Sequence, residues 1–349
     1  MLPTKGYAAQ NKQSSLTPFS FERRALTPHD VLIEILYCGV CHSDIHQAKN
    51  EWGGSIFPMV PGHEIVGKIT QVGSAVKHFK IGDLAGVGCF VDSCRSCHNC
   101  KDGLEQFCAD TVFTYNSLEK NSKTPTYGGY SSQVVVDEKY TLRIPENLEL
   151  ARTAPLLCAG ITTYSPLKHL NVGKGHRVAI AGLGGLGHMG VKLAAAMGAE
   201  VTVLSTSLHK AKDAKNLGAH YFETTADANT TLKLANHFDV IINTIAAKHD
   251  TNLYLSMLKR DGVMVMVGLP SEPLSVNTFS IVMGRKTLMG SSIGGIAQTQ
   301  EMLDYCAAHQ IMADIEIIAI QDINLAYERL LKSAVKYRFV IDMKTLAST

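Results

Sequence analysis

The chain has 349 residues, of which 46% are hydrophobic and 18% charged, so it is too long and too apolar for a disordered tail or a small disulfide-stapled module. Its 33 basic residues nearly balance 31 acidic ones and are scattered, which excludes a basic surface for nucleic acid or an anionic membrane. We therefore expect a small-molecule ligand and, because one domain usually takes roughly 100 to 200 residues, two domains with a cleft between them.

The start of the chain, Met1 to Gly6, lacks the apolar core of a signal peptide, and no run of about 18 apolar residues follows. These features predict a cytoplasmic protein. The nine cysteines are an odd number, which argues against full disulfide pairing. In a reducing compartment, clustered thiols more often bind metal.

Short alternating or apolar runs, broken by Gly, Pro and Asp turns, characterise the first 150 or so residues. Residues 31–36 and 133–136 are examples. Such runs predict short antiparallel strands, so we expect this part of the chain to be mostly β.

Four cysteines lie within 15 positions: Cys94, Cys97, Cys100 and Cys108. Four thiolates at roughly 2.3 Å around one Zn²⁺ make a closed tetrahedron, so the cluster predicts a structural zinc site. A ferredoxin-type cluster would need a shorter last gap and usually a Pro after the final Cys, where this chain has Ala109. Disulfides and metal-free buried thiols are the remaining alternatives.

Ligand-type side chains also gather in residues 41–46 and 62–64. The five other cysteines are Cys38, Cys41, Cys89, Cys158 and Cys306. No closely spaced pair among these five forms a second site alone, and a single Cys or His is more often core packing than a ligand. Spacing therefore leaves these residues unassigned.

After about Asn171, buried-strand runs alternate with helix-length stretches; the runs are residues 178–181, 201–204, 239–242 and 263–267. This alternation predicts a parallel sheet with helices on both faces. Apolar residues at helical spacing from Leu186 to Met197 predict the first helix, which Gly198 ends. Near the C-terminus we expect helices at 300–308 and 322–331 and strands at 315–320 and 337–341.

The first of these strands runs into a G-x-G-x-x-G sequence and then the first helix. The loop is Gly182-Leu183-Gly184-Gly185-Leu186-Gly187. In this strand–loop–helix context the glycines predict a dinucleotide site, because they allow a tight turn and close approach of a pyrophosphate to the helix N-terminus. A glycine-rich turn without a ligand is the alternative.

Eighteen residues after Gly187, where an NAD-selective protein usually has Asp or Glu, this chain has Ser205. Thr206, Ser207 and Lys210 follow, so the position offers hydroxyls and a cation and lacks a carboxylate that would repel a 2′-phosphate. This favours NADP(H) over NAD(H). A capped helix start explains the hydroxyls equally well, but not the missing acid.

Several strings together resemble the zinc-dependent medium-chain alcohol dehydrogenases. They are Cys41-His42-Ser43-Asp44-Ile45-His46, Gly62-His63-Glu64-Ile65-Val66-Gly67 with Gly73, the tetrad from Cys94 to Cys108, and Ala154 to Gly160. Residues 157–162, 184–190 and 337–340 are similar to the cinnamyl alcohol dehydrogenase branch. The resemblance covers nearly the whole chain, in order.

This resemblance implies an α/β protein with a GroES-like β-rich catalytic domain, residues 1–157 with 293–349, and a Rossmann domain, residues 158–292. It also implies a homodimer with two Zn²⁺ per subunit. The implied catalytic ligands are Cys41, His63 and Cys158, the Cys₂His set that is known for alcohol dehydrogenase. The fourth position is left for a water or substrate oxygen.

The resemblance also assigns roles around the metal. Glu64 is implied as a carboxylate close to the zinc, and Asp44 as the acid that holds the His63 ring. Ser43 and His46, with the nicotinamide ribose between them, are implied as a proton path while hydride passes between substrate and nicotinamide. Thr162, in the shared string, is implied at the cofactor.

For the substrate pocket, the resemblance points to Trp52, Phe113, Ser292 and Ile293, each of which is also a plausible core residue. Plant members tend to carry Trp at the position of Phe113 and Phe at that of Ser292. We therefore expect a roomier pocket and an aldehyde reductase that accepts aromatic and medium-chain aliphatic aldehydes.

Three alternatives are weaker. A zinc-free quinone reductase would not need the tetrad, Cys41 or Cys158. A polyol dehydrogenase is disfavoured by Trp52 and by the branch-specific strings. A catalytically idle NADPH- and zinc-binding structural protein is disfavoured by the intact ligand set.

Overall fold

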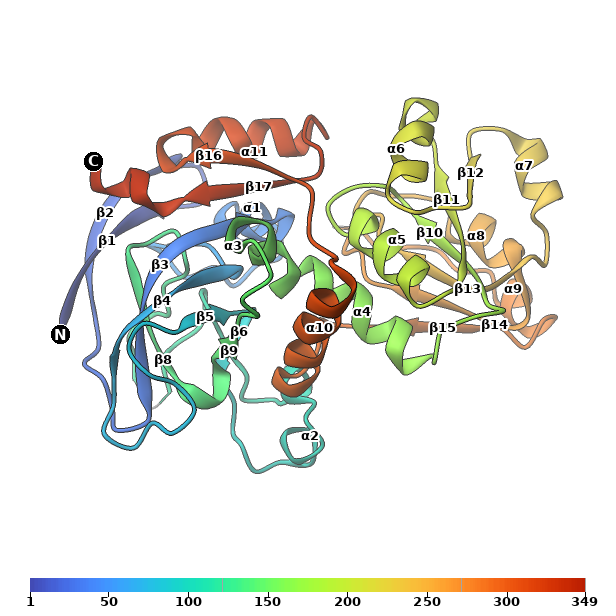
Figure 1. Ribbon diagram of the computed structural model, residues 1–349. Helices are drawn as coiled ribbons and strands as arrows, with labels where there is room; N and C mark the ends of the chain where they lie inside the picture. The colour runs from blue at the N-terminus through green and yellow to red at the C-terminus, as the bar shows by residue number, and fades with distance from the viewer. Residues whose placement is uncertain (121, 271, 349) are drawn as a thin grey trace. The chain divides into compact units, whose positions relative to one another are not determined.

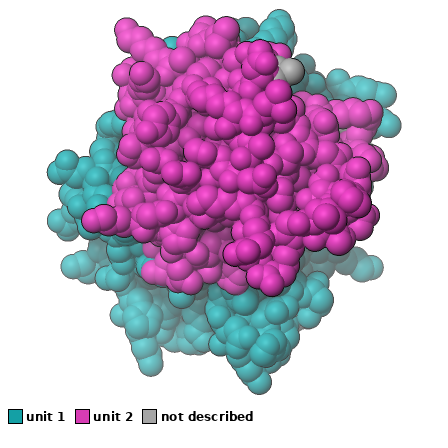
Figure 2. Space-filling model, turned by 90° about the vertical axis from the view of Figure 1, so that its right-hand side faces the viewer, with its two compact units in different colours: residues 1–161, 294–349 teal, residues 162–293 magenta. Residues whose placement is uncertain are grey.

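The computed structural model describes residues 1–120, 122–270 and 272–348 (Figure 1). The chain forms two compact units, coloured separately in Figure 2. Unit 1 comprises Met1–Ile161 and Gly294–Thr349, and unit 2 comprises Thr162–Ile293. The sequence-based boundaries were placed after residues 157 and 292. In both descriptions unit 2 is a single insertion into unit 1.

Unit 1 is built on a seven-stranded sheet in which β16-β17-β3-β4-β5-β9 are neighbours in that order and β8 pairs with β3. Its strands are β3 (Asp30–Val40), β4 (Ile65–Val72), β5 (Leu84–Val87), β8 (Gln133–Asp137), β9 (Leu142–Arg143), β16 (Ile315–Ala319) and β17 (Arg338–Asp342). Two smaller antiparallel pairs are β1 (Leu2–Ala9) with β2 (Leu16–Arg23), and β6 (Phe90–Asp92) with β7 (Val112–Phe113). The β-rich unit expected from the sequence is confirmed, with one parallel pair, β16 and β17, in the main sheet.

Short helices connect these strands. They are α1 (His42–Ala48), α2 (His98–Lys101), α3 (Leu150–Thr153), α10 (Ile296–His309) and α11 (Ile323–Leu331), with 3₁₀ turns η1 (Glu105–Phe107), η2 (Glu138–Tyr140), η3 (Ala154–Leu157), η5 (Ile320–Asp322) and η6 (Met343–Ser348). Helix α4 (Ala159–His169) runs from unit 1 into unit 2. The helices and strands predicted near the C-terminus are confirmed as α10, β16, α11 and β17.

Unit 2 is a parallel sheet in the order β12-β11-β10-β13-β14-β15. Its elements are β10 (Arg177–Ala181), α5 (Gly187–Ala196), β11 (Glu200–Ser205), η4 (Leu208–Lys210), α6 (Ala211–Asn216), β12 (Tyr221–Thr224), α7 (Ala228–Lys233), β13 (Phe238–Asn243), α8 (Thr251–Met257), β14 (Leu258–Met266), α9 (Thr278–Val282) and β15 (Thr287–Gly290). The strand order reverses between β10 and β13, so right-handed crossovers put α5 and α8 on opposite faces (Figure 1). This doubly wound sheet confirms the predicted Rossmann unit.

The four predicted strands of unit 2 are the inner ones, β10, β11, β13 and β14. Their core side chains are almost fully buried, among them Ile180, Val203, Ile241 and Met264. The edge strands β12 and β15 have no such apolar run, because each has only four residues and little buried surface. No described helix is long and apolar enough to cross a lipid bilayer.

Candidate metal centres and cofactor loop

Unit 1 brings together four buried side chains from three segments of the chain: Cys41, His63, Glu64 and Cys158. One ligand atom from each lies within 4.8 Å of the others. Cys41 follows β3, and His63 and Glu64 precede β4, so the antiparallel pairing of Cys38 with Ile65 places these segments side by side. Cys158 follows η3.

The chemistry of this cluster fits a divalent cation. Two thiols and an imidazole are ligands that Zn²⁺ prefers, and Cys41 and Cys158 are free thiols whose Sγ atoms lie 4.0 Å apart. The Cys158 thiol holds the pKa of Cys41 well below its usual range, which favours a thiolate. Glu64 pairs with Arg338 through Oε1, while its buried Oε2 has no hydrogen-bond partner among the described residues. A cation would compensate that oxygen.

Asp44 orients this cluster from inside the core. Its Oδ1 lies 3.1 Å from Nδ1 of His63 and accepts from the backbone N–H of Gly62, while Oδ2 accepts from the N–H of Cys41 at 2.9 Å. The hydroxyl of Tyr130 also donates to Oδ2, at 3.1 Å. Burial disfavours charge on His63, but neighbouring Asp44 outweighs it and raises the pKa of the ring. Because Nδ1 faces Asp44, Nε2 is left for a metal.

Ser43 and His46 lie in α1, three residues apart and therefore on one side of the helix. Oγ of Ser43 lies 3.7 Å from Sγ of Cys41. Nδ1 of His46 lies 2.5 Å from a carboxylate oxygen of Glu51, and its ring stacks on Trp52 with centroids 4.7 Å apart. Glu51 thereby leaves Nε2 of His46 as the nitrogen that can exchange a proton.

Sequence reasoning missed three partners in this region: Tyr130, Arg338 and Glu51. Arg338 belongs to a string that was noted only as shared with relatives, and Tyr130 carried no motif. The one available signal was for Glu51, which lies five residues after His46, close to the end of α1. Each of these residues acts on a predicted site residue rather than forming a site of its own.

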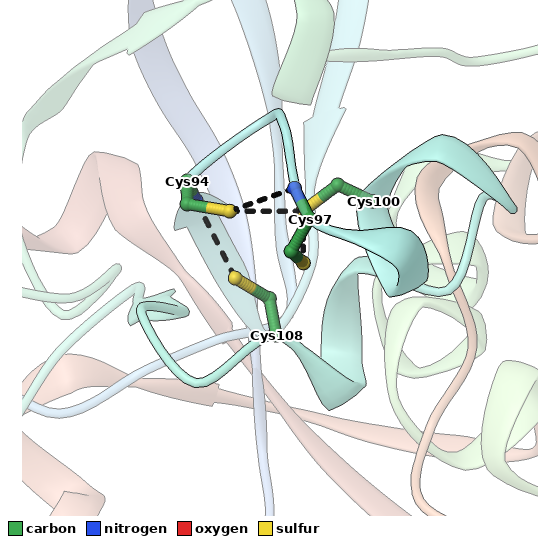
Figure 3. Close-up of side chains that lie close together, drawn as sticks. All are labelled: Cys94, Cys97, Cys100 and Cys108. Atoms are coloured by element: carbon green, nitrogen blue, oxygen red, sulfur yellow. Dashed lines mark hydrogen bonds between the residues drawn. The ribbon is translucent and has the colours of Figure 1, made fainter.

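The four-cysteine cluster is also assembled, as Figure 3 shows. Sγ of Cys100 lies 3.9 Å from Sγ of Cys94 and 3.5 Å from that of Cys97, and all four sulfurs lie within 4.8 Å of one another. The backbone N–H groups of Ser96 and Cys97 lower the pKa of Cys94 to about 6. With Cys108 as the fourth thiol and none of the four in a disulfide, the set fits a closed tetrahedral zinc site.

The glycine loop joins β10 to α5 in unit 2, as predicted. Gly182 has φ +89°, and a Cβ on Gly187 would lie 2.1 Å from the carbonyl oxygen of Gly182, so both positions require glycine. A Cβ on Gly184 would meet no atom within 4 Å, so its backbone is open to close approach. Gly185 and Leu186 complete the turn in front of the N-terminus of α5, an arrangement that fits a pyrophosphate.

The position predicted to face the cofactor's adenosine ribose lies at the end of β11, where Ser205 is the last strand residue. Its Oγ accepts from the N–H of Ser207, and Thr206 beside it is exposed. Nζ of Lys210 donates to the carbonyl of Leu183 at 2.9 Å, so a hydrogen bond connects the segment after β11 to the glycine loop. The residues present therefore fit a phosphorylated ribose.

The remaining predicted residues are divided between the units. Thr162 is buried in α4. Trp52 and Phe113 in unit 1 are 37% and 47% exposed, and Ser292 and Ile293 follow β15 in unit 2. Ile293 has φ +39°, a left-handed conformation that is strained for a β-branched residue and is often found at functional sites. The pocket role of these residues stays a prediction.

Comparison with known families agrees with this fold. Residues 27–146 match the alcohol dehydrogenase GroES-like domain, and residues 185–308 match the zinc-binding dehydrogenase family. The chain belongs to the zinc-dependent medium-chain alcohol dehydrogenases.

Three similar proteins show where in this family the chain lies. An NADP-dependent alcohol dehydrogenase C of Mycolicibacterium smegmatis is 55% identical over the full length of both chains. The structure of a cinnamyl alcohol dehydrogenase from Sorghum bicolor superimposes with a TM-score of 0.96 at 44% identity, covering 98% of each chain. The CAD from Helicobacter pylori, solved with NADP(H), gives 0.93 at 47% identity, covering 98% of this chain and 99% of that one.

Proposed function

We propose that this protein is an NADP(H)-dependent alcohol dehydrogenase and aldehyde reductase, acting on aromatic and medium-chain aliphatic primary alcohols and aldehydes. The observation that carries the proposal is the buried cluster of Cys41, His63 and Cys158, beside a Glu64 oxygen without a partner. The alternative of a zinc-free reductase would not need these thiols. The similar proteins named above support the cofactor and the substrate class.

In this proposal Cys41, His63 and Cys158 hold one Zn²⁺, which when bound supplies a Lewis acid for a carbonyl or alcohol oxygen. NADP(H) supplies or accepts the hydride. Asp44 keeps the His63 ring in a single orientation and tautomer. The Ser43 hydroxyl gives a proton to the substrate oxygen during reduction and regains one by way of His46, which Glu51 orients and which takes its proton from solvent.

The four-cysteine cluster holds a second Zn²⁺ in this proposal. Four thiolates leave no coordination position for a substrate, so this ion serves the structure of residues 94–108. Two Zn²⁺ per subunit are therefore expected, and metal analysis of the purified protein measures this number.

The function is tested by following NADPH absorbance with benzaldehyde or cinnamaldehyde, before and after zinc chelation. We expect aldehyde-dependent oxidation that chelation abolishes. An aldehyde panel without chelation-sensitive oxidation would favour the idle structural protein, and faster turnover of NADP⁺ with mannitol or sorbitol would favour the polyol dehydrogenase.

Cofactor preference is expected to depend on Ser205. In the S205D variant, a carboxylate would face the 2′-phosphate, and we expect kcat/KM for NADPH to fall by about 100-fold, equivalent to about 2.7 kcal/mol, while that for NADH changes little. The S205A variant is the matched control, because it removes the hydroxyl without adding charge and should lose far less. Equal losses in both variants would contradict the proposed phosphate position.

We also propose a homodimer formed through unit 2. Strand β15 is an edge of the sheet, and the neighbouring α9 segment exposes three large apolar side chains, Phe279, Val282 and Met283, each at least 65% exposed. Light scattering should give about twice the chain mass, and M283E should shift it toward one chain. A monomeric wild-type protein would contradict this proposal. Location in the cytoplasm stays a prediction.

A further inference from the structure

Unit 1 contains a cavity of about 310 Å³ that none of the candidate site residues lines. One part of its wall is apolar and includes Val91, Val112 and Val134, and the other part is charged. The volume lies at the lower end of the range for small-ligand pockets, about 300–1,000 Å³.

Arg23 at the end of β2 lines this cavity and is only 6% exposed. Its Nε donates to the carbonyl of Gln133 at 2.6 Å, and its Nη2 donates to the carbonyl of Gly128 at 3.0 Å and to Oγ of Ser131 at 2.9 Å. All three acceptors are neutral. Among the described residues, Nη1 has no hydrogen-bond partner and no carboxylate lies within 4.0 Å of the guanidinium. A buried cation without an anion is costly.

The other basic side chains of the cavity wall already have acidic partners. Arg24 pairs with Asp30 through both guanidinium Nη atoms and lies 3.8 Å from Glu119. Arg95 bridges Asp92 and Asp137, at 2.8 and 2.7 Å, and Lys120 lies 3.9 Å from Asp92. Among the basic side chains that line this cavity, Arg23 is therefore the one without a carboxylate within 4.0 Å. Burial lowers the pKa of Arg23 to about 9, although the charge of Glu119 acts in the opposite direction from beyond ion-pair distance.

We propose that this cavity binds a small organic monocarboxylate, whose carboxylate accepts from Nη1 of Arg23 while its apolar body packs on the valines. A single charge is favoured because a dianion such as phosphate would also face Asp30, Asp92, Glu119 and Asp137. The apolar wall favours an organic ligand over a simple inorganic ion.

The test is a ¹⁹F NMR titration of the zinc-loaded protein with 4-fluorobenzoate. We expect saturable binding with a Kd of about 1 mM or below. R23Q, which removes the cation, and V112F, which fills the cavity and keeps Arg23, should each weaken binding by about tenfold or more. V76F, a similar enlargement outside the cavity wall, should leave the Kd unchanged. If R23Q does not fold, the Kd of V112F still tests whether the ligand binds in this cavity.

Three results would overturn the proposal. One is binding that both R23Q and V112F retain. A second is binding that C158S abolishes, because the carboxylate would then bind at the Cys41 cluster. The third is inorganic phosphate competing more strongly than benzoate.

Anomalous density for bromine near Arg23, in crystals grown with 4-bromobenzoate, would support the proposed position, and density only near Cys158 would contradict it. The proposal does not depend on the catalytic function.

Discussion

Replacing His63 by alanine or Cys158 by serine is expected to reduce aldehyde reduction to background. The loss should be about 10⁴-fold or more, equivalent to about 5 kcal/mol of transition-state stabilisation. The reason is that three buried side chains, Cys41, His63 and Cys158, form the proposed ligand set, and each variant removes one of them. Initial rates with NADPH and benzaldehyde, together with zinc content, measure the effect.

The zinc content of these variants should fall from two ions per chain to one, since the four-cysteine cluster is unchanged. C306S is the matched control: Cys306 is also fully buried, its Sγ contacts Sδ of Met302 at 3.6 Å, and it belongs to neither cluster. That control should keep both ions and nearly full activity. A folded His63 or Cys158 variant that has lost its ion and turns over normally would refute the assignment.

Replacing Cys97 by serine is expected to destabilise the protein without removing the catalytic ligands. None of the residues from Cys94 to Phe107 is buried, so this segment has almost no hydrophobic core of its own. Its order must come from elsewhere, and structural Zn²⁺ binding contributes about 10–16 kcal/mol in zinc-finger peptides. Even partial loss of this contribution should lower the melting temperature by about 10 °C or more.

Thermal melting, limited proteolysis and zinc content measure this second effect. We expect earlier melting, new cleavage within residues 94–108 and one ion per chain instead of two. Activity per folded molecule at low temperature should fall much less than in the His63 variant. A C97S protein that keeps one ion but melts and resists proteolysis like the wild type would show that the segment does not need the metal.

The features that sequence predicted well are those in which the determining residues are close together in the chain. The glycine turn before α5, the end of β11 at Ser205 and the spacing of the four cysteines from Cys94 to Cys108 each depend on backbone conformation or ligand reach over a few residues. The inner strands of unit 2 could also be predicted from the sequence, because strands buried on both faces need continuous apolar runs.

The catalytic cluster could not be derived in this way, and family resemblance was needed to propose it. Cys41 and Cys158 are 117 positions apart, Tyr130 reaches Asp44 across 86, and Arg338 reaches Glu64 across 274. No local pattern records such pairs. The register of β3 with β4 and β17 brings Glu64 close to Arg338, whereas Cys158 follows η3 and Tyr130 precedes β8. The unpaired charge of Arg23 is likewise visible only in the folded chain, since it depends on which acids the other cations have already bound.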